Sequence, residues 1–139
     1  MSLLEDKDQI RELLANYCFC YDEARFDDWL ALWVQDPVFD ADGYVLRGRT
    51  GLLQFIGAAE LVDGKPPMKH YVMNEIIQVD GDAASARCYL LVVRKRKDGA
   101  LLAGSAGTYT DKIVREGGRW LFAERKVRRD LRYEPLLGK

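Results

Sequence analysis

Histidine is almost absent from this sequence, since His70 is the only one among 139 residues. Zinc and iron sites draw on several histidines, cysteines or carboxylates at set spacings, and Cys18 and Cys20 form only an isolated C-x-C pair. We therefore expect no bound metal. Motifs of the G-x-G-x-x-G, P-loop, G-x-S-x-G and H-E-x-x-H types are missing as well, which argues against the common nucleotide-binding, serine-hydrolase and zinc-protease chemistries.

Cysteine is scarce, and the three present (Cys18, Cys20 and Cys88) are odd in number with no C-x-x-C spacing. This pattern favours reduced, buried thiols over a disulfide framework. The first residues lack both a basic segment and an apolar one, and no run approaches the ~18 apolar residues of a membrane span. We expect a cytoplasmic protein without a secretory signal or membrane contact.

No charge of one sign dominates, because 21 basic residues face 22 acidic ones. A protein that neutralises nucleic-acid phosphates needs a basic surplus, so nucleic acid is not expected as a partner, although residues 126–132 are locally basic. The length fits one domain, residues 1–139, and the 48% hydrophobic content is enough for a real core.

The order of periodic segments predicts an α+β fold with helices first and a meander sheet after them. Apolar residues at helical spacing predict helices, and turn pairs such as Asp80-Gly81 and Asp98-Gly99 separate long strand-like segments. The helices are expected at 5–23, 26–34 and 50–60, short strands around 38–39 and 44–46, and long strands at 69–79, 83–97, 100–115 and 119–130.

The strand expected at 83–97 is apolar on both faces, with Leu90 and Val92 on one and Tyr89 and Leu91 on the other. Both faces of such a strand must be covered. The helices can cover one, so we expect a homodimer or homotrimer formed through the other face of the sheet.

His70 and Asp22 are the first candidates for chemistry. Histidine is the side chain whose ordinary pKa permits proton exchange near neutrality. Asp22 continues the buried stripe of the first helix at its C-terminal end, where the helix dipole disfavours a carboxylate, so a proton-donating partner such as His70 would stabilise it. The alternatives are that Asp22 caps the turn or pairs with Arg25, and that His70 is structural.

Aromatic and basic residues supply the remaining candidates. Tyr17 and Tyr21 lie one turn apart on the first helix and could offer hydroxyls to a ligand, or could simply be core. In the last strand, Arg125 shares a face with Leu121 and Ala123 by the period-2 rule, which predicts a cation at a pocket edge that binds an oxyanion. The alternative is a solvated strand end. Trp33, Asn74 and Arg129 are further candidates for contact with a ligand.

The ordered set of these signals resembles the SnoaL-like branch of the NTF2-like superfamily over nearly the whole chain. The matching positions are Ile10, Leu13, Tyr17 and Asp22, then 27–29, Gly48 and Gly51, His70 and Asn74, 79–84, Gly107, Tyr109 and Asp111, and Gly118 with Trp120. The resemblance implies a cone-shaped α+β barrel, in which N-terminal helices pack on a curved, mostly antiparallel sheet, and oligomers built through that sheet.

Three cofactor-free eliminating enzyme groups of that superfamily are similar in their working residues. Scytalone dehydratase, bile-acid 7α-dehydratase and hexachlorocyclohexane dehydrochlorinase pair a histidine with an aspartate of the first helix, which Asp22 and His70 match. Tyr17 matches the helix tyrosine of the bile-acid enzyme, and Arg125 and Arg129 match arginines in these groups. This chain lacks the second histidine of scytalone dehydratase and the acidic residue that the bile-acid enzyme carries near Leu91.

Two functions follow from this sequence. The first is a cofactor-free acid–base enzyme, of the dehydratase/lyase or isomerase type, that acts on a small, mostly apolar ring-containing molecule. His70 and Asp22 act in the internal pocket of the fold, with Tyr17 assisting. The second is a non-catalytic binding or assembly module that resembles a ring-hydroxylating dioxygenase β-subunit. An open hollow at His70 would favour the enzyme, and a solidly packed interior would favour the module.

Overall fold

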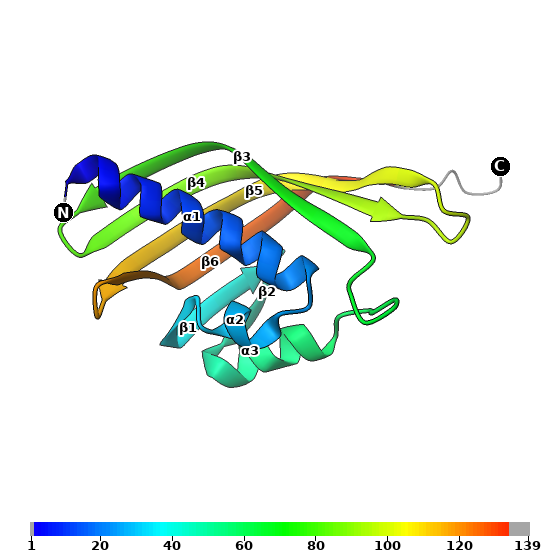
Figure 1. Ribbon diagram of the computed structural model, residues 1–139, viewed down its shortest axis with the longest axis horizontal. Coiled ribbons are helices and arrows are strands. Elements are labelled where there is room, and N and C mark those ends of the chain that lie inside the picture. The colour runs from blue at the N-terminus through cyan, green and yellow to red at the C-terminus, as the bar shows by residue number, and fades with distance from the viewer. Residues whose placement is uncertain (1, 134–139) are drawn as a thin grey trace.

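Ser2 and Glu5 start the first helix, α1 (Leu3–Asp22), in the computed structural model, which describes residues 2–133. Glu5 N donates to Ser2 Oγ over 3.2 Å and Ser2 N donates to Glu5 Oε2 over 2.9 Å, so each side chain satisfies a main-chain amide of the first turn. The buried face of α1 includes Ile10, Leu14 and Tyr17. This face packs onto the sheet, which the helix crosses obliquely (Figure 1).

Helix α2 (Phe26–Leu30) ends earlier than the sequence pattern predicts, and Trp33 is the first residue of strand β1 (Trp33–Ala41). The expectation of a helix to residue 34 was therefore wrong. Trp33 pairs with Phe122, and Phe122 N donates to Leu32 O over 2.9 Å. Pairing with a distant strand outweighs the local helical spacing of the tryptophan.

Strand β2 (Tyr44–Arg47) returns antiparallel to β1 and leads into helix α3 (Gly48–Gly57). The turn between the strands has positive φ at Asp42 (54°) and Gly43 (91°), as the Asp-Gly pair predicts for a type I′ turn.

Four long strands form the meander that the turn pairs predict. They are β3 (Met68–Asp80), β4 (Ala83–Lys95), β5 (Leu101–Glu116) and β6 (Arg119–Arg132). The sheet has the order β2-β1-β6-β5-β4-β3, and only the β1–β6 pair is parallel. Helices followed by a mixed, mostly antiparallel sheet confirm the α+β prediction, and β3 is left as an edge strand beside α1 (Figure 1).

An irregularity in β6 overturns the expected grouping of its side chains. Phe122 pairs with Ile113 and Glu124 pairs with Lys112, so Ala123 is an extra residue without a partner in the ladder. A β-bulge of this kind changes which side chains share a face. Arg125 consequently points to the same buried side as Phe122, and not to the side of Leu121 and Ala123.

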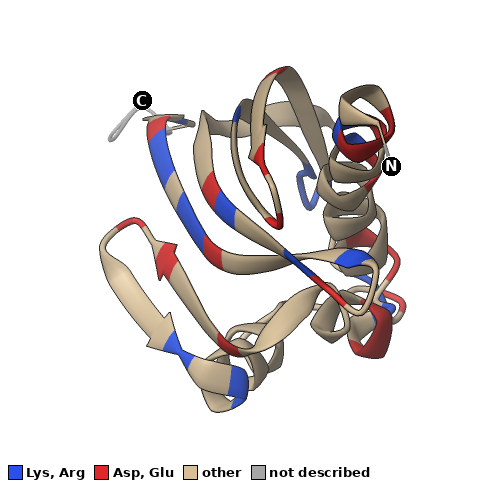
Figure 2. Cartoon of the chain, turned by 90° about the vertical axis from the view of Figure 1, so that its left-hand side faces the viewer, with Lys and Arg blue, Asp and Glu red and all other residues tan. Residues whose placement is uncertain are grey.

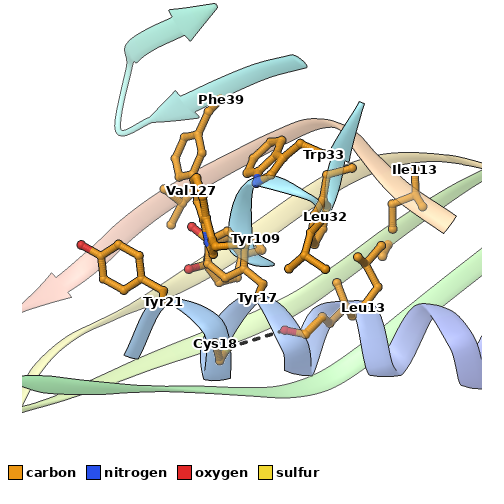
Figure 3. Close-up of a cluster of buried hydrophobic side chains, with 14 of the residues drawn as sticks. Leu13, Tyr17, Cys18, Tyr21, Leu32, Trp33, Phe39, Tyr109, Ile113 and Val127 are labelled. Atoms are coloured by element: carbon orange, nitrogen blue, oxygen red, sulfur yellow. Dashed lines mark hydrogen bonds between the residues drawn. The ribbon is translucent and has the colours of Figure 1, made fainter. Parts of the chain in front are cut away.

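Aromatic side chains fill the space between α1 and the inner face of the sheet (Figure 3). The Tyr17 ring lies 5.4 Å from Trp29, 5.7 Å from Tyr109 and 5.8 Å from Phe122, measured between centroids. The Trp33 ring lies 6.3 Å from that of Tyr17. The middle of the cone is therefore a packed core.

Candidate functional site

Asp22, at the end of α1, and His70, near the start of β3, meet at the edge of the sheet. Asp22 Oδ1 lies 2.6 Å from His70 Nδ1, and Asp22 Oδ2 accepts a hydrogen bond from the His70 main-chain N–H over 2.7 Å. Both side chains are mostly buried, with 12% of each exposed. One carboxylate thus fixes the imidazole ring and the strand that carries it.

The Asp22 contact decides which ring nitrogen carries the proton. An ionised carboxylate only accepts hydrogen bonds, so Nδ1 must be the donor across the 2.6 Å contact. In the neutral ring Nε2 is then left with a free lone pair, which can take a proton from a substrate. The carboxylate also stabilises the imidazolium that forms when it does so.

A cavity of about 490 Å³ reaches the His70–Asp22 pair between α1 and β3. Its volume lies within the usual range for small-molecule sites. The lining combines apolar and charged side chains from α1, the turn after it, the loop before β3, and β3 itself. These residues are Ala15, Cys18, Phe19, Asp22, Glu23, Lys65, Lys69, His70, Tyr71 and Val72.

The structure separates the aromatic candidates. The Tyr21 ring lies edge-on to the imidazole, with 5.4 Å between ring centroids, so Tyr21 is the phenol that accompanies His70. Tyr17 and Trp33 are 2% and 3% exposed in the aromatic core and are not part of the cavity lining. Burial raises the pKa of Tyr17 well above its usual value, and nearby Tyr109 adds to the rise, so this phenol stays neutral.

Arg125 is fully buried and forms an ion pair with Asp111 that the sequence analysis did not foresee. The guanidinium carbon lies 3.3 Å from the Tyr109 ring centroid and 4.1 Å from that of Tyr17, and Arg125 Nε lies 3.0 Å from Asp111 Oδ1. The contact is an ion pair without aligned hydrogen bonds, since none of the charged atoms of either residue has a hydrogen-bond partner within residues 2–133. Arg125 is therefore a core cation and not one at a pocket edge.

The charge state of the Asp111–Arg125 pair reflects two opposing effects. Burial raises the pKa of the Asp111 carboxyl to about 6, while the nearby Arg125 charge works against the rise. The sequence does contain a sign of this ion pair. Asp111 lies two residues from both Tyr109 and Ile113 on β5, so it shares their apolar, buried face. A charge at such a position calls for a partner.

Arg129 and Asn74 lie apart from the His70 cavity. Asp42 holds Arg129, accepting from its main-chain N–H and from Nε, each over 2.8 Å. Asn74 is exposed, has φ of 62° and lies in an irregularity where β3 and β4 lose register. It lines a hollow with Arg87, Tyr89 and other residues of the outer face of the sheet.

The cysteine thiols are held in their unreactive form. Burial raises the pKa of Cys18 to about 12 and that of Cys88 to about 11, and Cys18 Sγ donates to Leu14 O over 3.6 Å (Figure 3). Since the thiolate is the nucleophile, we expect Cys18 and Cys88 to resist iodoacetamide at pH 8 in the folded protein and to react in guanidinium. Mass spectrometry of each cysteine peptide measures this; rapid labelling of native Cys18 would contradict it.

Other kinds of site find little support in the described residues. Between residues 2 and 133, no three His, Cys, Asp or Glu side chains gather to hold a metal ion. The helices described there are too short or too polar to cross a membrane. Figure 2 shows basic and acidic positions on the same strands and loops, with several basic positions close together along β6.

The chain matches the SnoaL-like domain over residues 2–126. It belongs to the SnoaL-like domain family. The uncharacterized protein Rv2910c of Mycobacterium tuberculosis (strain ATCC 25618 / H37Rv) is 30% identical over 131 residues, covering 88% of this chain and 84% of that protein. Because that relative is uncharacterized, the function proposed for this SnoaL-like protein rests on the geometry of its own site.

Solved structures give the fold independently. An NTF2-like protein with a cystatin-like fold from Novosphingobium aromaticivorans is 25% identical with a TM-score of 0.79, covering 90% of this chain and 82% of that one. The β subunit of a protein assigned as an aromatic-ring-hydroxylating dioxygenase, from N. aromaticivorans DSM 12444, is 22% identical with a TM-score of 0.77, covering 96% and 95%. The SnoaL-like protein thus has the NTF2-like fold, and a fold by itself does not determine a function.

Proposed function

We propose that this SnoaL-like protein is a cofactor-independent acid–base enzyme, a dehydratase-type lyase or an isomerase. Its substrate is a small, mostly apolar, ring-containing molecule. The observation that carries the proposal is the two-point contact of Asp22 with His70 at the wall of a cavity of about 490 Å³. A structural histidine needs neither a hollow beside it nor a ring nitrogen left free.

In the proposed reaction, His70 Nε2 takes a proton from a carbon next to an electron-withdrawing group. The C–H electron pair moves to form an enolate or, with loss of a β-hydroxyl, a new double bond. The imidazolium then returns its proton to the departing hydroxyl, which leaves as water, or to another carbon of the same molecule, which gives an isomer. Tyr21 is 7% exposed and does not line the cavity, so its part in the proposal is to pack edge-on against the imidazole and hold the ring in place.

Tyr17 and Arg125 take a different role in this proposal from the one that the resemblance implies. Both are sealed in the core, where Tyr17 packs against the Arg125 guanidinium. They support the inner face of α1 and so position the turn that ends in Asp22. Arg129, held by Asp42, fixes the β1–β2 turn against β6.

Solvent-deuterium exchange tests the proton-transfer step without knowledge of the natural substrate. A panel of small ring ketones, such as 2-tetralone and 1-indanone, is incubated in D₂O, and loss of the α-proton NMR signals is followed with and without protein. We expect at least one ketone to exchange faster than in buffer, and the acceleration to vanish in His70→Gln. Exchange that survives this substitution would contradict the proposal.

The packed aromatic interior favours a second candidate, a non-catalytic module in which Asp22 and His70 only join α1 to β3. The module predicts that His70→Gln lowers the melting temperature and changes nothing else. It also predicts that no ketone of the panel exchanges above the buffer rate. The same samples therefore distinguish the two functions.

We also propose that the protein forms a homodimer or homotrimer through the outer face of the sheet. Exposed apolar side chains on β3 and β4 support this, with Ile76 61% and Tyr89 54% exposed. Light scattering after size exclusion at micromolar concentration is expected to give two or three times the monomer mass. Tyr89→Lys should lower that mass, whereas Tyr44→Lys, at an exposed position on β2, should not. A monomeric wild type would refute the assembly.

A further inference from the structure

Within the described part of the chain, the acids in the lining of the His70 cavity have partners, whereas its lysines do not. Apart from the histidine, the lining carries two acids, Asp22 and Glu23, and two lysines, Lys65 and Lys69. Asp22 is occupied by His70, and Glu23 Oε1 lies 3.0 Å from Arg25 Nη2. Within residues 2–133, neither lysine has a carboxylate within 4.0 Å. The cavity lining therefore carries two lysines that no carboxylate of these residues pairs with directly.

Both lysines stand on fixed backbone. Lys65 and Val62 exchange two main-chain hydrogen bonds of 3.2 and 2.8 Å, which close a small turn in the loop before β3. Lys69 precedes His70 directly in β3 and pairs with Val93 of β4. Both lysines are exposed and both line the cavity.

Next to these charges lies an apolar wall. Phe19 is 60% exposed and Tyr71 is 48% exposed, and both line the cavity together with Ala15 and Val72. Large aromatic side chains left uncovered beside unpaired cations suit a ligand with an apolar body and one negative group.

We propose that the His70 cavity recognises an organic anion, a carboxylic acid with an apolar ring or chain, through Lys65 and Lys69. The proposal deepens the acid–base function above and rests on it only in taking this cavity as the substrate site. The carboxylate sits at the two ammonium groups and the apolar body on Phe19 and Tyr71. The lysines recognise the carboxylate of the ligand, while the carbon that loses its proton lies nearer the imidazole.

The single histidine makes the test specific, since only one imidazole contributes NMR signals. The probes are 3-phenylpropanoate and its neutral analogue 3-phenylpropanamide, titrated at low ionic strength while the His70 ring signals are followed. We expect both to shift these signals, with the acid binding about tenfold more tightly, in line with two exposed charge contacts. Added NaCl should reduce the preference for the acid.

Lysine variants distinguish the effect of the two cavity lysines on binding from the effect of the protein's overall charge. In Lys65→Gln/Lys69→Gln the acid is expected to bind no more tightly than the amide, while the amide keeps its affinity. The control is Lys97→Gln, which removes the same kind of charge from a separate hollow of about 1020 Å³ lined also by Arg94 and Arg96. That variant should keep the tenfold preference.

Three results would overturn the anion subsite: equal binding of acid and amide, an unchanged preference in the double variant, or no shift of the His70 signals by either probe at millimolar concentration. These results are distinct from failure of the enzymatic proposal. Deuterium exchange that depends on His70 with no preference for the acid leaves the chemistry and removes the subsite. Preference for the acid with no exchange on any substrate, 3-phenylpropanoate included, leaves a binding protein for organic acids.

Discussion

Replacing Asp111 by asparagine is expected to lower the free energy of unfolding by about 3–5 kcal/mol at pH 7.5, the usual cost of leaving one partner of a buried ion pair uncompensated. Arg125 is wholly enclosed, and the Asp111 carboxylate is the counter-charge 3.0 Å from its Nε. The rings of Tyr109 and Tyr17 stabilise the cation but do not neutralise it. Chemical denaturation followed by tryptophan fluorescence measures the loss.

A double substitution and an exposed control make this prediction independent of whether the single variant folds. Arg125→Met/Asp111→Val removes both charges with apolar side chains and is expected to be within about 1–2 kcal/mol of the wild type, or more stable. Asp98→Asn, which breaks the exposed pair with Arg96, should cost less than about 1 kcal/mol. A single variant Asp111→Asn as stable as the control would show that Arg125 needs no counter-charge.

The second large effect concerns the dyad. We expect His70→Gln to reduce proton-exchange turnover by about 10²–10⁴-fold, the range for loss of a positioned general base. Asp22→Asn should cause a loss of the same order by another route. The asparagine oxygen can still accept the His70 main-chain N–H, but its amide group now donates to Nδ1 and moves the ring proton to Nε2, where the base must be free.

Imidazole ¹⁵N shifts distinguish that route from a simple loss of structure. The wild type should show the Nδ1–H tautomer and Asp22→Asn the Nε2–H tautomer, with little change in the rest of the amide spectrum. Asp28→Asn is the matched control, because Asp28 is exposed, lies six residues further on and pairs with Arg25. Full turnover in Asp22→Asn with the altered tautomer would remove the general-base role from His70.

Much of the fold could be predicted because its signals are local. The turn pairs at Asp80-Gly81 and Asp98-Gly99 define the meander, and both glycines have positive φ. The Asp22–His70 pair was a candidate because a carboxylate on a buried helical stripe needs a partner and the chain has one histidine. The structure decides between this pair and the alternatives, a turn cap or a pair with Arg25.

The features that could not be predicted depend on pairing between distant segments. Ala123 looks like any strand residue, yet its bulge turns Arg125 into the core. Trp33 has helical spacing in the sequence, but it pairs with Phe122 of β6 and so belongs to the sheet. Lys65 and Lys69 line the cavity only because α1 packs beside β3. Nothing in the sequence around either lysine indicates that this helix lies next to them.

Strand β3 ends the sheet, and an edge strand offers its free main-chain groups to any other extended chain. Asp22 Oδ2 occupies one of those groups, the His70 amide, and α1 lies alongside. Fraying of the last turn of α1 would therefore release the imidazole and uncover the edge in a single event. On heating, the loss of activity and the onset of self-association should therefore occur over the same temperature range. Inactivated protein would already expose the edge strand through which aggregation can start.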